Sequence, residues 1–545
     1  MLGLMQHRPL LVSSLLEHAA EAHPNAPIVS RAPDGAVHRS SYRELDSRAR
    51  RLARALRALG VRRGDRVGTM AWNGSRHLEL FFGVSGMGAV LHTVNPRLFA
   101  EQIGYIVNHA EDRHLFFDMG FATLVEQLAP GLRSVEHFVA MTDRAHLPDV
   151  RIPNLLCYED LIAAEDGPYD WPEFDENSAS SLCYTSGTTG NPKGVLYSHR
   201  STLLHAMSCC MTDGVGLSAT DVLFMAAPMF HVNAWGTPYA CTMSGAGMVL
   251  PGPALDGASI YRAMRDERVT VALGVPTVWM TLQQHVASQG LDPRQELCLN
   301  RVLIGGSAAP RSVVEGFELQ FGTHVLHGWG MTETSPLAAV CSPLRKHQGA
   351  TVQQRIELQA RQGRPPYGVS TKLIDEDGRT LAHDGKTAGH LLVRGHWVTA
   401  GYFGRENGPA LDADGWFDTG DIATIDADGY IQITDRAKDL IKSGGEWISS
   451  IALENAAVGH PSVAEAAVIA IAHEKWQERP LMIVVKKPGR EVTREALLEY
   501  LADKVAKWWL PDDVIFVDEL PHTATGKLQK MKLREKFTGY RFANP

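Results

Sequence analysis

The stretch from Tyr184 to Gly194 reads YTSGTTGNPKG and combines the residue types that could hold a polyphosphate. Glycine lets backbone N–H groups converge on an anion because it has no Cβ to stand in the way. The side chains that add donors or charge are those of Thr185, Ser186, Thr188, Thr189 and Lys193. We therefore predict a phosphate-binding loop. A flexible turn rich in serine and glycine is the alternative.

This loop is not of the Walker A type found in P-loop NTPases. That motif ends in Gly-Lys-Ser/Thr, whereas Lys193 lies between Pro192 and Gly194. A P-loop NTPase that releases phosphate is therefore disfavoured. The apolar residues 181–184 predict a short buried strand before the loop, and a helix is predicted from 200 to about 211.

A second stretch that could do chemistry is 228–236, PMFHVNAWG. An apolar strand that ends in His231 and Trp235 would suit the wall of a pocket. A buried histidine or tryptophan is also a common core residue, so both interpretations stay open for these two side chains.

Residues 302–310 predict a strand and a glycine-rich turn, and residues 327–333, HGWGMTE, come next. The face of Trp329 suits a purine because an aromatic ring packs well against another π-system. Thr332 could donate to a phosphate, and the carboxylate of Glu333 is a hard oxygen ligand suited to Mg²⁺ on ATP. The alternative for Thr332 is a helix N-cap.

Charged residues gather again between 415 and 447. A carboxylate can accept hydrogen bonds from two ribose hydroxyls at once, and Asp421 is the candidate, whereas Asp418 is predicted to satisfy its own turn. The run over 435–447, DRAKDLIKSGGEW, is either a nucleotide-binding segment or a solvated face. Lys527 stands on a glycine turn, where a lysine is commonly just solvated.

The composition bounds the class of protein. A chain of 545 residues is too long for one core, and a net charge of −8 argues against a general nucleic-acid binder. Seven cysteines without C-x-x-C spacing predict reduced thiols and neither a disulfide framework nor a zinc site. Histidine, arginine and glutamate interrupt the apolar residues at the start of the chain, which argues against a signal peptide. No run approaches the ~18 apolar residues of a membrane span. A cytoplasmic protein is therefore predicted.

Helical and strand patterns alternate in the first part of the chain. Helices are predicted over 10–25, 41–59 and 78–87, and strands over 66–70 and 89–94. This alternation is typical of a parallel α/β sheet covered on both faces.

The pattern changes twice after residue 366. Asp-Gly pairs at 377–378, 384–385, 414–415 and 428–429 separate short alternating runs, which predicts hairpins and a small β-barrel. A small module of helices and strands follows. Its helices are predicted over 451–458 and 494–507, and its strands over 464–471 and 481–486.

These stretches together resemble the adenylate-forming enzymes, which include acyl-CoA synthetases, firefly luciferases and peptide-synthetase adenylation domains. YTSGTTGNPKG is similar to their phosphate-binding signature, and the likeness extends over essentially the whole chain. Many relatives have Asn-Ile-Ser-Pro where this chain has Trp447-Ile448-Ser449-Ser450. That departure, together with the opening MLGLMQHRPLLVSSLLEHAA, resembles fatty-acyl-CoA and 3-(methylthio)propionyl-CoA ligases.

The resemblance implies an α/β fold in two parts. A large AMP-binding domain, 1–434, would contain two α/β sheet subdomains and a small β-barrel. A small mobile α+β lid domain, 435–545, would turn about Asp435. ATP, Mg²⁺ and coenzyme A are implied as cofactor and cosubstrates, and a homodimer is implied because related enzymes are often dimers.

The resemblance also assigns roles to individual residues. The catalytic residues would be Lys527, His231, Thr185 and Glu333, and the metal ligands would be Thr185 and Glu333. The acid would lie against His231, Val232, Trp235, Gly305 and Gly306. Contacts to the nucleotide and coenzyme A would come from Thr185, Ser186, Gly187, Thr188, Thr189, Gly190, Lys193, Gly306, Ser307, Ala308, His327, Gly328, Trp329, Gly330, Met331, Thr332, Asp421, Ile433, Arg436, Lys438, Lys442, Gly444, Gly445 and Trp447.

The implied activity is that of an AMP-forming acyl-CoA ligase. A carboxylate would attack the α-phosphorus of ATP, and the coenzyme A thiol would then displace AMP from the acyl-AMP. The implied acid is aliphatic, either a short, medium or long fatty acid or 3-(methylthio)propionate. A ligase for an aryl or other acid, and a nucleotide-binding relative without catalysis, are the alternatives.

Overall fold

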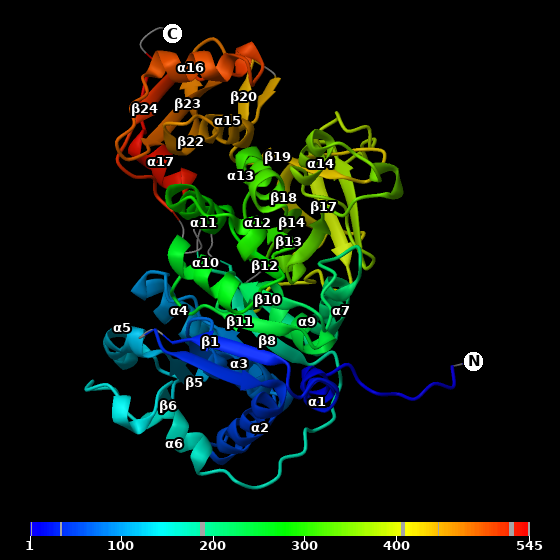
Figure 1. Ribbon diagram of the computed structural model, residues 1–545, viewed down its shortest axis with the longest axis vertical. Helices are drawn as coiled ribbons and strands as arrows, with labels where there is room; N and C mark the ends of the chain where they lie inside the picture. Colours follow the sequence, from blue (N-terminus) through cyan, green and yellow to red (C-terminus); the bar gives the residue numbers. More distant parts are fainter. Residues whose placement is uncertain are drawn as a thin grey trace.

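Two large sheets form most of the computed structural model, which describes residues 1, 3–32, 35–185, 191–404, 409–444, 446–522 and 528–542 (Figure 1). The first sheet has the strand order β7-β6-β5-β3-β4-β8-β9. In that order the strands are Leu155–Cys157, His137–Ala140, Asp112–Phe117, Arg66–Met70, Val90–Thr93, Ala179–Tyr184 and Gly194–Ser198. The β8–β9 pair is antiparallel and the other pairs are parallel.

The second sheet has the strand order β15-β14-β13-β12-β10-β11-β1-β2. In that order the strands are Leu337–Val340, His324–Gly330, Arg301–Ile304, Val271–Gly274, Val222–Met225, Gly247–Leu250, Pro27–Arg31 and Val37–Ser41. Its inner pairs are parallel, and the antiparallel pairs lie at the two edges. The predicted parallel α/β architecture is confirmed.

A layer of helices lies between the two sheets and forms the main core with both of them. One buried cluster contains side chains from both sheets and from these helices, among them Leu16, Leu52, Phe81, Leu91 and Leu223. The helices of this layer are α1 (Val12–Ala22), α2 (Tyr42–Ala58), α3 (Ser75–Gly86), α7 (His199–Cys210) and α9 (Thr237–Ser244). The prediction of helices at 10–25, 41–59 and 78–87 is confirmed.

Further helices cover the two outer faces. A second core packs α10 (Gly257–Asp266), α11 (Pro276–Gln289) and α13 (Arg311–Gly316) on the sheet that contains β13. A third core packs α4 (Ala100–Ala110) and α5 (Ala122–Leu128) on the sheet that contains β5. Each sheet is therefore buried on both faces, as parallel sheets require.

The predicted small barrel takes the form of a four-stranded antiparallel sheet. Its strands, in order, are β16 (Val369–Ile374), β17 (Gly389–Gly395), β18 (Phe417–Ile425) and β19 (Ile431–Arg436). The glycines of the four Asp-Gly pairs have φ values of 81°, 73°, 79° and 85°. The hairpin prediction rested on this left-handed backbone, which glycine adopts without strain.

The last part of the chain is a separate unit above the sheets in Figure 1. Its sheet contains β20 (Ile441–Ser443), β21 (Glu446–Ile448), β22 (Val463–His473), β23 (Gln477–Lys486) and β24 (Asp513–Phe516). Helices α15 (Ser450–Val458), α16 (Arg494–Ala502) and α17 (Lys530–Lys536) pack on it through two small cores. The predicted helices and strands of this module are confirmed within a few residues.

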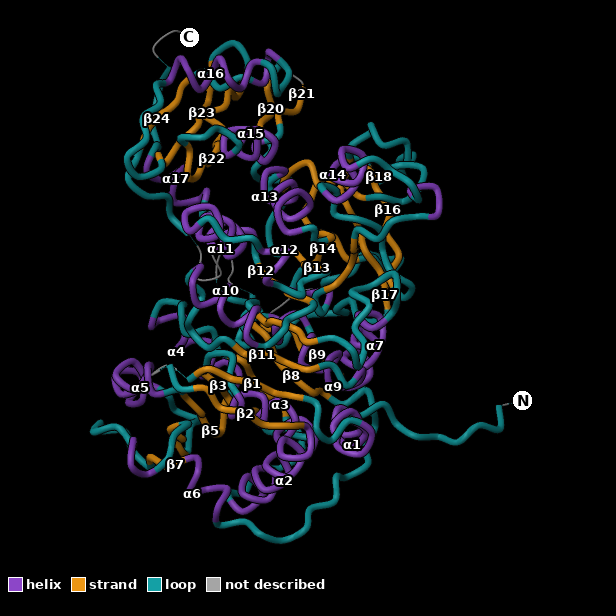
Figure 2. The backbone as a smooth tube through the Cα atoms, in the orientation of Figure 1, coloured by secondary structure: helices purple, strands orange, loops and turns teal. Residues whose placement is uncertain are grey.

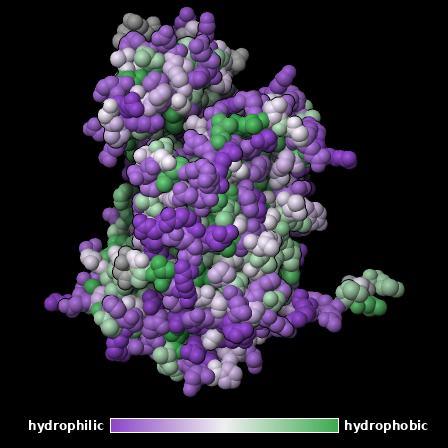
Figure 3. Space-filling model, in the orientation of Figure 1, coloured by the Kyte–Doolittle hydropathy of each residue, from purple (hydrophilic) through white to green (hydrophobic). Residues whose placement is uncertain are grey.

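The other end of the chain is an extended loop. Residues 3–8 form an exposed arm that leaves the body of the molecule (Figure 2), and Met1, Leu4 and Met5 are exposed apolar residues of this end. Figure 3 shows apolar surface at the tip of the arm. None of the described helices offers an apolar stretch long enough to cross a membrane. All seven cysteines are described, and each is a free thiol, as predicted.

Two expectations about strands need correction. Residues 194–198 form a strand, β9, which the sequence did not reveal. Residues 228–236 form no strand; the turn α8 (Val232–Trp235) lies there instead. The reason is local, since four consecutive residues of this turn have positive φ values, which no strand permits.

Candidate active site

The predicted site segments follow the carboxyl ends of three strands. Thr185 follows β8, Gly305 follows β13, and β14 ends at Gly330. Ligands of open α/β sheets bind beyond such strand ends. A backbone bridge between Gly194 and Phe403 brings a further loop, 399–403, to the same place.

The phosphate loop is closed at its base by its first and last described residues. The backbone N–H of Thr185 donates to the carbonyl oxygen of Lys193 at 2.9 Å. The backbone N–H of Lys193 donates to Thr185 Oγ1 at 3.3 Å. The loop is therefore a hairpin connection between β8 and β9. The predicted contacts Ser186, Gly187, Thr188, Thr189 and Gly190 lie outside the described residues.

Tyr402 links the phosphate loop to the predicted metal ligand. The Lys193 ammonium lies 4.8 Å from the centre of the Tyr402 ring. The Tyr402 hydroxyl donates to Glu333 Oε1 at 2.8 Å, and burial raises the pKa of this hydroxyl, so it stays protonated. Glu333 is only 7% exposed. Sequence reasoning missed Tyr402, because an aromatic residue in a loop gives no signal of a partner 69 positions away.

The turn that carries Glu333 is held by its backbone. The Tyr197 hydroxyl donates to the carbonyl oxygen of Thr332 at 2.7 Å. The N–H of Thr399 donates to the carbonyl oxygen of Glu333 at 2.7 Å. Thr332 is the first residue of a 3₁₀ turn, Thr332–Thr334, and Met331 occupies the N-cap position before it. The N–H of Met331 donates to Thr334 Oγ1. The alternative interpretation of Thr332 as an N-cap is therefore wrong.

Three side chains predicted to meet the nucleotide contact each other. The indole N–H of Trp329 donates to Asp421 Oδ2 at 3.0 Å, and Arg436 Nε donates to Asp421 Oδ1 at 2.8 Å. Asp421 is 2% exposed. Ile433 packs in the same small core as Trp329. Asp418, three residues earlier, accepts from the N–H of Gly420, which agrees with its predicted turn role.

His327 lies behind the predicted adenine segment and supports it. Its Nε2 accepts from the N–H of Ala309 at 3.3 Å, and its Nδ1 contacts the carbonyl oxygen of Ala360 at 3.1 Å. Burial lowers its pKa to about 4, so the ring is neutral. The geometry thus assigns His327 to the support of the turn after β13, where Ser307 is exposed and Gly306 and Ala308 are partly exposed.

Two glycines of β14 allow close backbone packing at the same strand end. A Cβ on Gly330 would lie 1.8 Å from the carbonyl oxygen of Pro336, and one on Gly328 would lie 3.2 Å from the Leu303 side chain. Gly330 therefore allows the close approach of β15 at the bulge between β14 and β15. This bulge comes directly before Met331 and the turn that carries Glu333.

The segment predicted to line the pocket for the carboxylic acid, residues 231–235, contains a left-handed turn. Val232, Asn233, Ala234 and Trp235 have φ values of 48°, 52°, 49° and 58°, a conformation that costs roughly 1–2 kcal/mol for each non-glycine residue. The Trp235 ring lies against the backbone of β13's end, since a Cβ on Gly305 would approach it to 3.3 Å. His231, at the start of the turn, is partly buried. The structure therefore brings Trp235 to Gly305 and Gly306, and His231 and Val232 lie in the same turn as Trp235.

The predicted pivot, Asp435, is buried at the junction with the last unit. Its carboxylate accepts from the N–H and hydroxyl of Ser450, both at 2.6 Å. The Ser450 hydroxyl is also bound by the buried ammonium of Lys530, which pairs with Glu454 at 2.8 Å. Burial raises the pKa of Glu454 to about 7. Sequence reasoning missed Lys530, because a lysine in a basic tail carries no mark of burial.

The other predicted contacts of the last unit are spread along its surface. Lys438 and Lys442 are exposed, and Trp447 is partly buried. Lys442 Nζ lies 3.6 Å from Glu376. Gly444 has a φ of +60°, and a Cβ there would lie 2.8 Å from the Trp476 ring. Gly445 and Lys527 lie outside the described residues.

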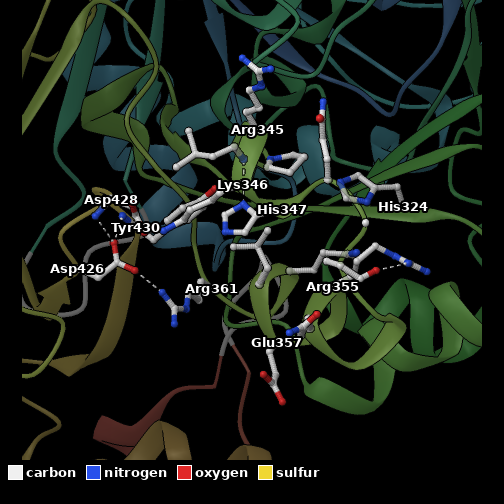
Figure 4. Close-up of a pocket in the computed structure, with 18 residues that line it drawn as sticks. His324, Arg345, Lys346, His347, Arg355, Glu357, Arg361, Asp426, Asp428 and Tyr430 are labelled. Atoms are coloured by element: carbon white, nitrogen blue, oxygen red, sulfur yellow. Dashed lines mark hydrogen bonds and ion pairs between the residues drawn. The ribbon is translucent and has the colours of Figure 1, made fainter.

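A cavity of about 630 Å³ adjoins Gly444. Its walls are Ser443, Gly444, Trp476, Arg479, Trp508 and Asp512. A larger cavity of about 730 Å³ lies elsewhere, at the amino end of β14, where His324, Arg345, His347 and Tyr430 line it (Figure 4). Three of its cations are paired with acids, Lys346 with Asp428, Arg361 with Asp426 and Arg355 with Glu318. These three cations are already neutralised, and among the described residues none of the sequence motifs for a nucleotide lines this cavity.

Comparison with known proteins agrees with this geometry. Residues 16–403 match the AMP-binding enzyme family, and residues 452–527 match the AMP-binding enzyme C-terminal domain. The chain therefore belongs to the AMP-binding enzyme family.

Curated relatives and a solved structure are similar over nearly the whole chain. The chain is 52% identical to a 3-methylmercaptopropionyl-CoA ligase of Ruegeria lacuscaerulensis, covering 98% of this chain and 99% of that protein. It is 51% identical to a medium-chain-fatty-acid–CoA ligase of Ectopseudomonas oleovorans, covering 98% of each. A crystal structure of an anthranilate CoA ligase in complex with anthranoyl-AMP matches with a TM-score of 0.84 and 26% identity, over 97% of this chain and 98% of that one.

Proposed function

We propose that this chain is an ATP-dependent, AMP-forming acyl-CoA ligase that activates an aliphatic carboxylic acid. The observation that carries the proposal is the identity of 51–52% over 98% of the chain to ligases for a thioether acid and for medium-chain fatty acids. An identity this high over the whole length includes both the site and the last unit. A small carboxylic acid, ATP and coenzyme A are then the substrates.

In the first half-reaction an acid oxygen attacks the α-phosphorus of ATP and pyrophosphate leaves. Negative charge concentrates on the phosphoryl oxygens, so fixed cations and N–H donors provide the catalysis. Lys527 bridges the acid and the α-phosphate, and Lys193 holds the outer phosphates. Asp421 and Arg436 meet the ribose, and Trp329 lies against the purine. Their mutual hydrogen bonds fix the three side chains before the nucleotide arrives.

Glu333 and Thr185 are proposed to hold Mg²⁺ with the ATP phosphates. The donor set fits a hard cation, because carboxylate and hydroxyl oxygens are the ligands that Mg²⁺ prefers. Tyr402 bonds to one carboxylate oxygen of Glu333, and a carboxylate retains lone pairs for a cation. Bound Mg²⁺ would neutralise charge on the phosphate oxygens.

In the second half-reaction the coenzyme A thiol attacks the acyl carbonyl and AMP leaves. We propose that the boundary between the domains 1–434 and 435–545 is a hinge at Asp435. Rotation there would replace Lys527 by the Gly444–Gly445 segment, beside which a thin pantetheine arm can pass. Two motifs on one small unit suit two steps that need different faces of it.

The acid end is proposed to lie at His231 and Trp235. Trp235→Ala should change the preference among acids of different chain length more than it changes the KM for ATP, because the indole lies against the end of β13, at the proposed acid site. Initial rates with acids from four to sixteen carbons measure both quantities. An unchanged acid profile would remove the assignment.

A panel of acids tests the function itself. The purified protein is given ATP, Mg²⁺ and coenzyme A with aliphatic acids, 3-(methylthio)propionate, and benzoate or anthranilate, and AMP and thioester are measured. We expect AMP and acyl-CoA in equal amounts with aliphatic acids. Turnover of the aryl acids alone would favour a ligase for aryl acids. ATP binding without pyrophosphate release would favour a nucleotide-binding relative without catalysis.

Two further proposals concern the protein in the cell. A homodimer is proposed from the likeness to dimeric relatives, and light scattering on the eluting protein measures its mass. A cytoplasmic location is supported by seven free thiols, which are typical of a reducing compartment.

A further inference from the structure

We propose that Asn233 is a positioning residue for the acid, because its buried side-chain amide fixes the left-handed turn that carries Trp235. This proposal rests on the proposed function and adds to it a residue that lies behind the acid site. The residue acts through Trp235 and His231 on the choice of acid.

The turn needs an external constraint to persist. Four successive residues with side chains, 232–235, have φ between 48° and 58°, and Gly236 continues at 71°. In this conformation each Cβ approaches the following carbonyl oxygen, so the right-handed form is the more stable one for an isolated chain. Strained backbone of this kind persists where its surroundings over-determine it, and it clusters at ligand sites.

Asn233 supplies that constraint through three hydrogen bonds to two strands. Its Nδ2 donates to Ser181 Oγ on β8 at 2.9 Å. Its Oδ1 accepts from Thr93 Oγ1 on β4 and from Cys183 Sγ on β8, both at 3.4 Å. The residue is 3% exposed. An amide is the group that can both donate and accept here, which a hydrophobic residue of similar size cannot do.

A second buried asparagine holds the segment that leads to the turn. Asn73 Nδ2 donates to the carbonyl oxygens of Met225 and Ala227, both at 2.8 Å. The N–H of Met229 donates to Asn73 Oδ1 at 2.7 Å. The segment between β10 and the turn is therefore fixed by its backbone. The N–H of Ala234 also donates to the carbonyl oxygen of Pro228 at 3.1 Å, and Asn233 adds the side-chain hydrogen bonds that tie residues 232–235 to β4 and β8.

The position of the Trp235 ring depends on that conformation. The ring is close to the end of β13, since a Cβ on Gly305 would approach it to 3.3 Å and one on Gly306 to 3.6 Å. If residues 232–235 relaxed toward right-handed backbone, the ring would leave this place. Because β8 also leads directly into Thr185, Asn233 joins the left-handed turn to the strand that carries the phosphate loop.

Three variants separate the amide's role from that of the backbone conformation. Asn233→Gly keeps a residue that adopts positive φ without strain but removes the amide. Asn233→Ala removes both. Ser181→Ala removes one partner and leaves the turn's own sequence intact. Asn154→Ala is the matched control, because Asn154 also has a positive φ, of 49°, but is exposed and binds the carbonyl oxygen of Glu136.

For each variant, kcat/KM is measured for acids of increasing chain length, together with the KM for ATP and the Tm. We expect Asn233→Gly and Asn233→Ala to lower kcat/KM for the preferred acid by about 10–100-fold and to flatten the chain-length profile, because a misplacement of about 1 Å can cost 10²-fold. The KM for ATP should stay within about twofold. Ser181→Ala should act in the same direction, and the Ser181–Asn233 double variant should be no worse than Asn233→Ala, as for two residues that share one interaction.

Two results would overturn the proposal. One is a wild-type acid profile in Asn233→Gly, which would mean that the backbone conformation suffices without the amide. The other is an equal loss toward acid and ATP in a folded variant, which would mean a general structural role. If Asn233→Ala does not fold, Asn233→Gly and Ser181→Ala decide the question. A wild-type protein inactive on every acid would contradict the proposed function itself.

Discussion

The proposed nucleotide end and the proposed acid end of the site are built in different ways. At the nucleotide end, charged and aromatic side chains hold one another, as Trp329 and Arg436 do on Asp421 and as Tyr402 does on Glu333. At the acid end, a strained backbone turn is held by the buried amide of Asn233. We propose that the side-chain network serves the nucleotide, which is the same in every reaction, and that the backbone turn shapes the pocket for the acid.

The largest effect is expected at Lys527, for which we propose a role in the nucleotide chemistry. Lys527→Ala should reduce acyl-AMP formation about 10²–10³-fold, the usual effect of losing one fixed contact to developing charge. Conversion of supplied acyl-AMP to thioester should continue, because the proposed second step uses the Gly444–Gly445 segment and not Lys527. The two half-reactions are measured separately in a variant shown to fold by its Tm. Equal loss of both steps would refute the role.

Asp421→Asn should have the second largest effect, and it should fall on the binding of ATP. Removing the charge leaves Arg436 without its counter-ion at 2.8 Å, and hydrogen bonds to charged groups contribute about 1.5–3 kcal/mol, so the KM for ATP should rise about 10–100-fold. The acid profile should be unchanged. Asp418→Asn is the matched control, since this exposed carboxylate on the same strand bonds only to its own turn among the described residues. An effect of equal size in both variants would contradict the division into two ends.

Gly444→Ala should affect the thioester step. The left-handed backbone at φ +60° and the approach to Trp476 at 2.8 Å both disfavour a Cβ there, so thioester formation should fall about tenfold. Acyl-AMP formation should continue at nearly the wild-type rate. Gly489→Ala is the control, because Gly489 has a φ of +69° in the same unit and open space around its Cβ position. Loss of acyl-AMP formation would show that this glycine does not separate the steps.

The smallest effect is expected for Tyr402→Phe. It removes one hydrogen bond to Glu333 and keeps the ring beside Lys193, so activity at limiting Mg²⁺ should fall about 2–10-fold. Saturating Mg²⁺ should restore most of it. Tyr367→Phe, at an exposed tyrosine, is the control. A loss that is independent of the Mg²⁺ concentration would argue that Tyr402 does not serve Glu333.

Much of the fold was predictable because its signals are local. The strand 66–70 and the four Asp-Gly turns follow from short patterns and from glycine's tolerance of positive φ. The family motifs also singled out Trp329 and Asp421, which the structure places in contact. In each case residues close together in the sequence carry the information.

The features that were missed depend on contacts between distant segments. Strand β9 has its partner in β8 and carries an exposed leucine, Leu196, so no alternating pattern revealed it. Tyr402 and Lys530 matter through partners 69 and 76 positions away. The turn 232–235 was misjudged as a strand because apolar residues predict burial but not the sign of φ, which tertiary hydrogen bonds decide here.

Exchange of labelled pyrophosphate into ATP tests the central claim most directly, because it reports reversible acyl-AMP formation without coenzyme A. The protein is incubated with ATP, Mg²⁺, labelled pyrophosphate and a series of aliphatic acids. We predict exchange that requires an acid and varies with its chain length in the wild type. ATP bound in stoichiometric amount with no exchange for any acid would contradict it.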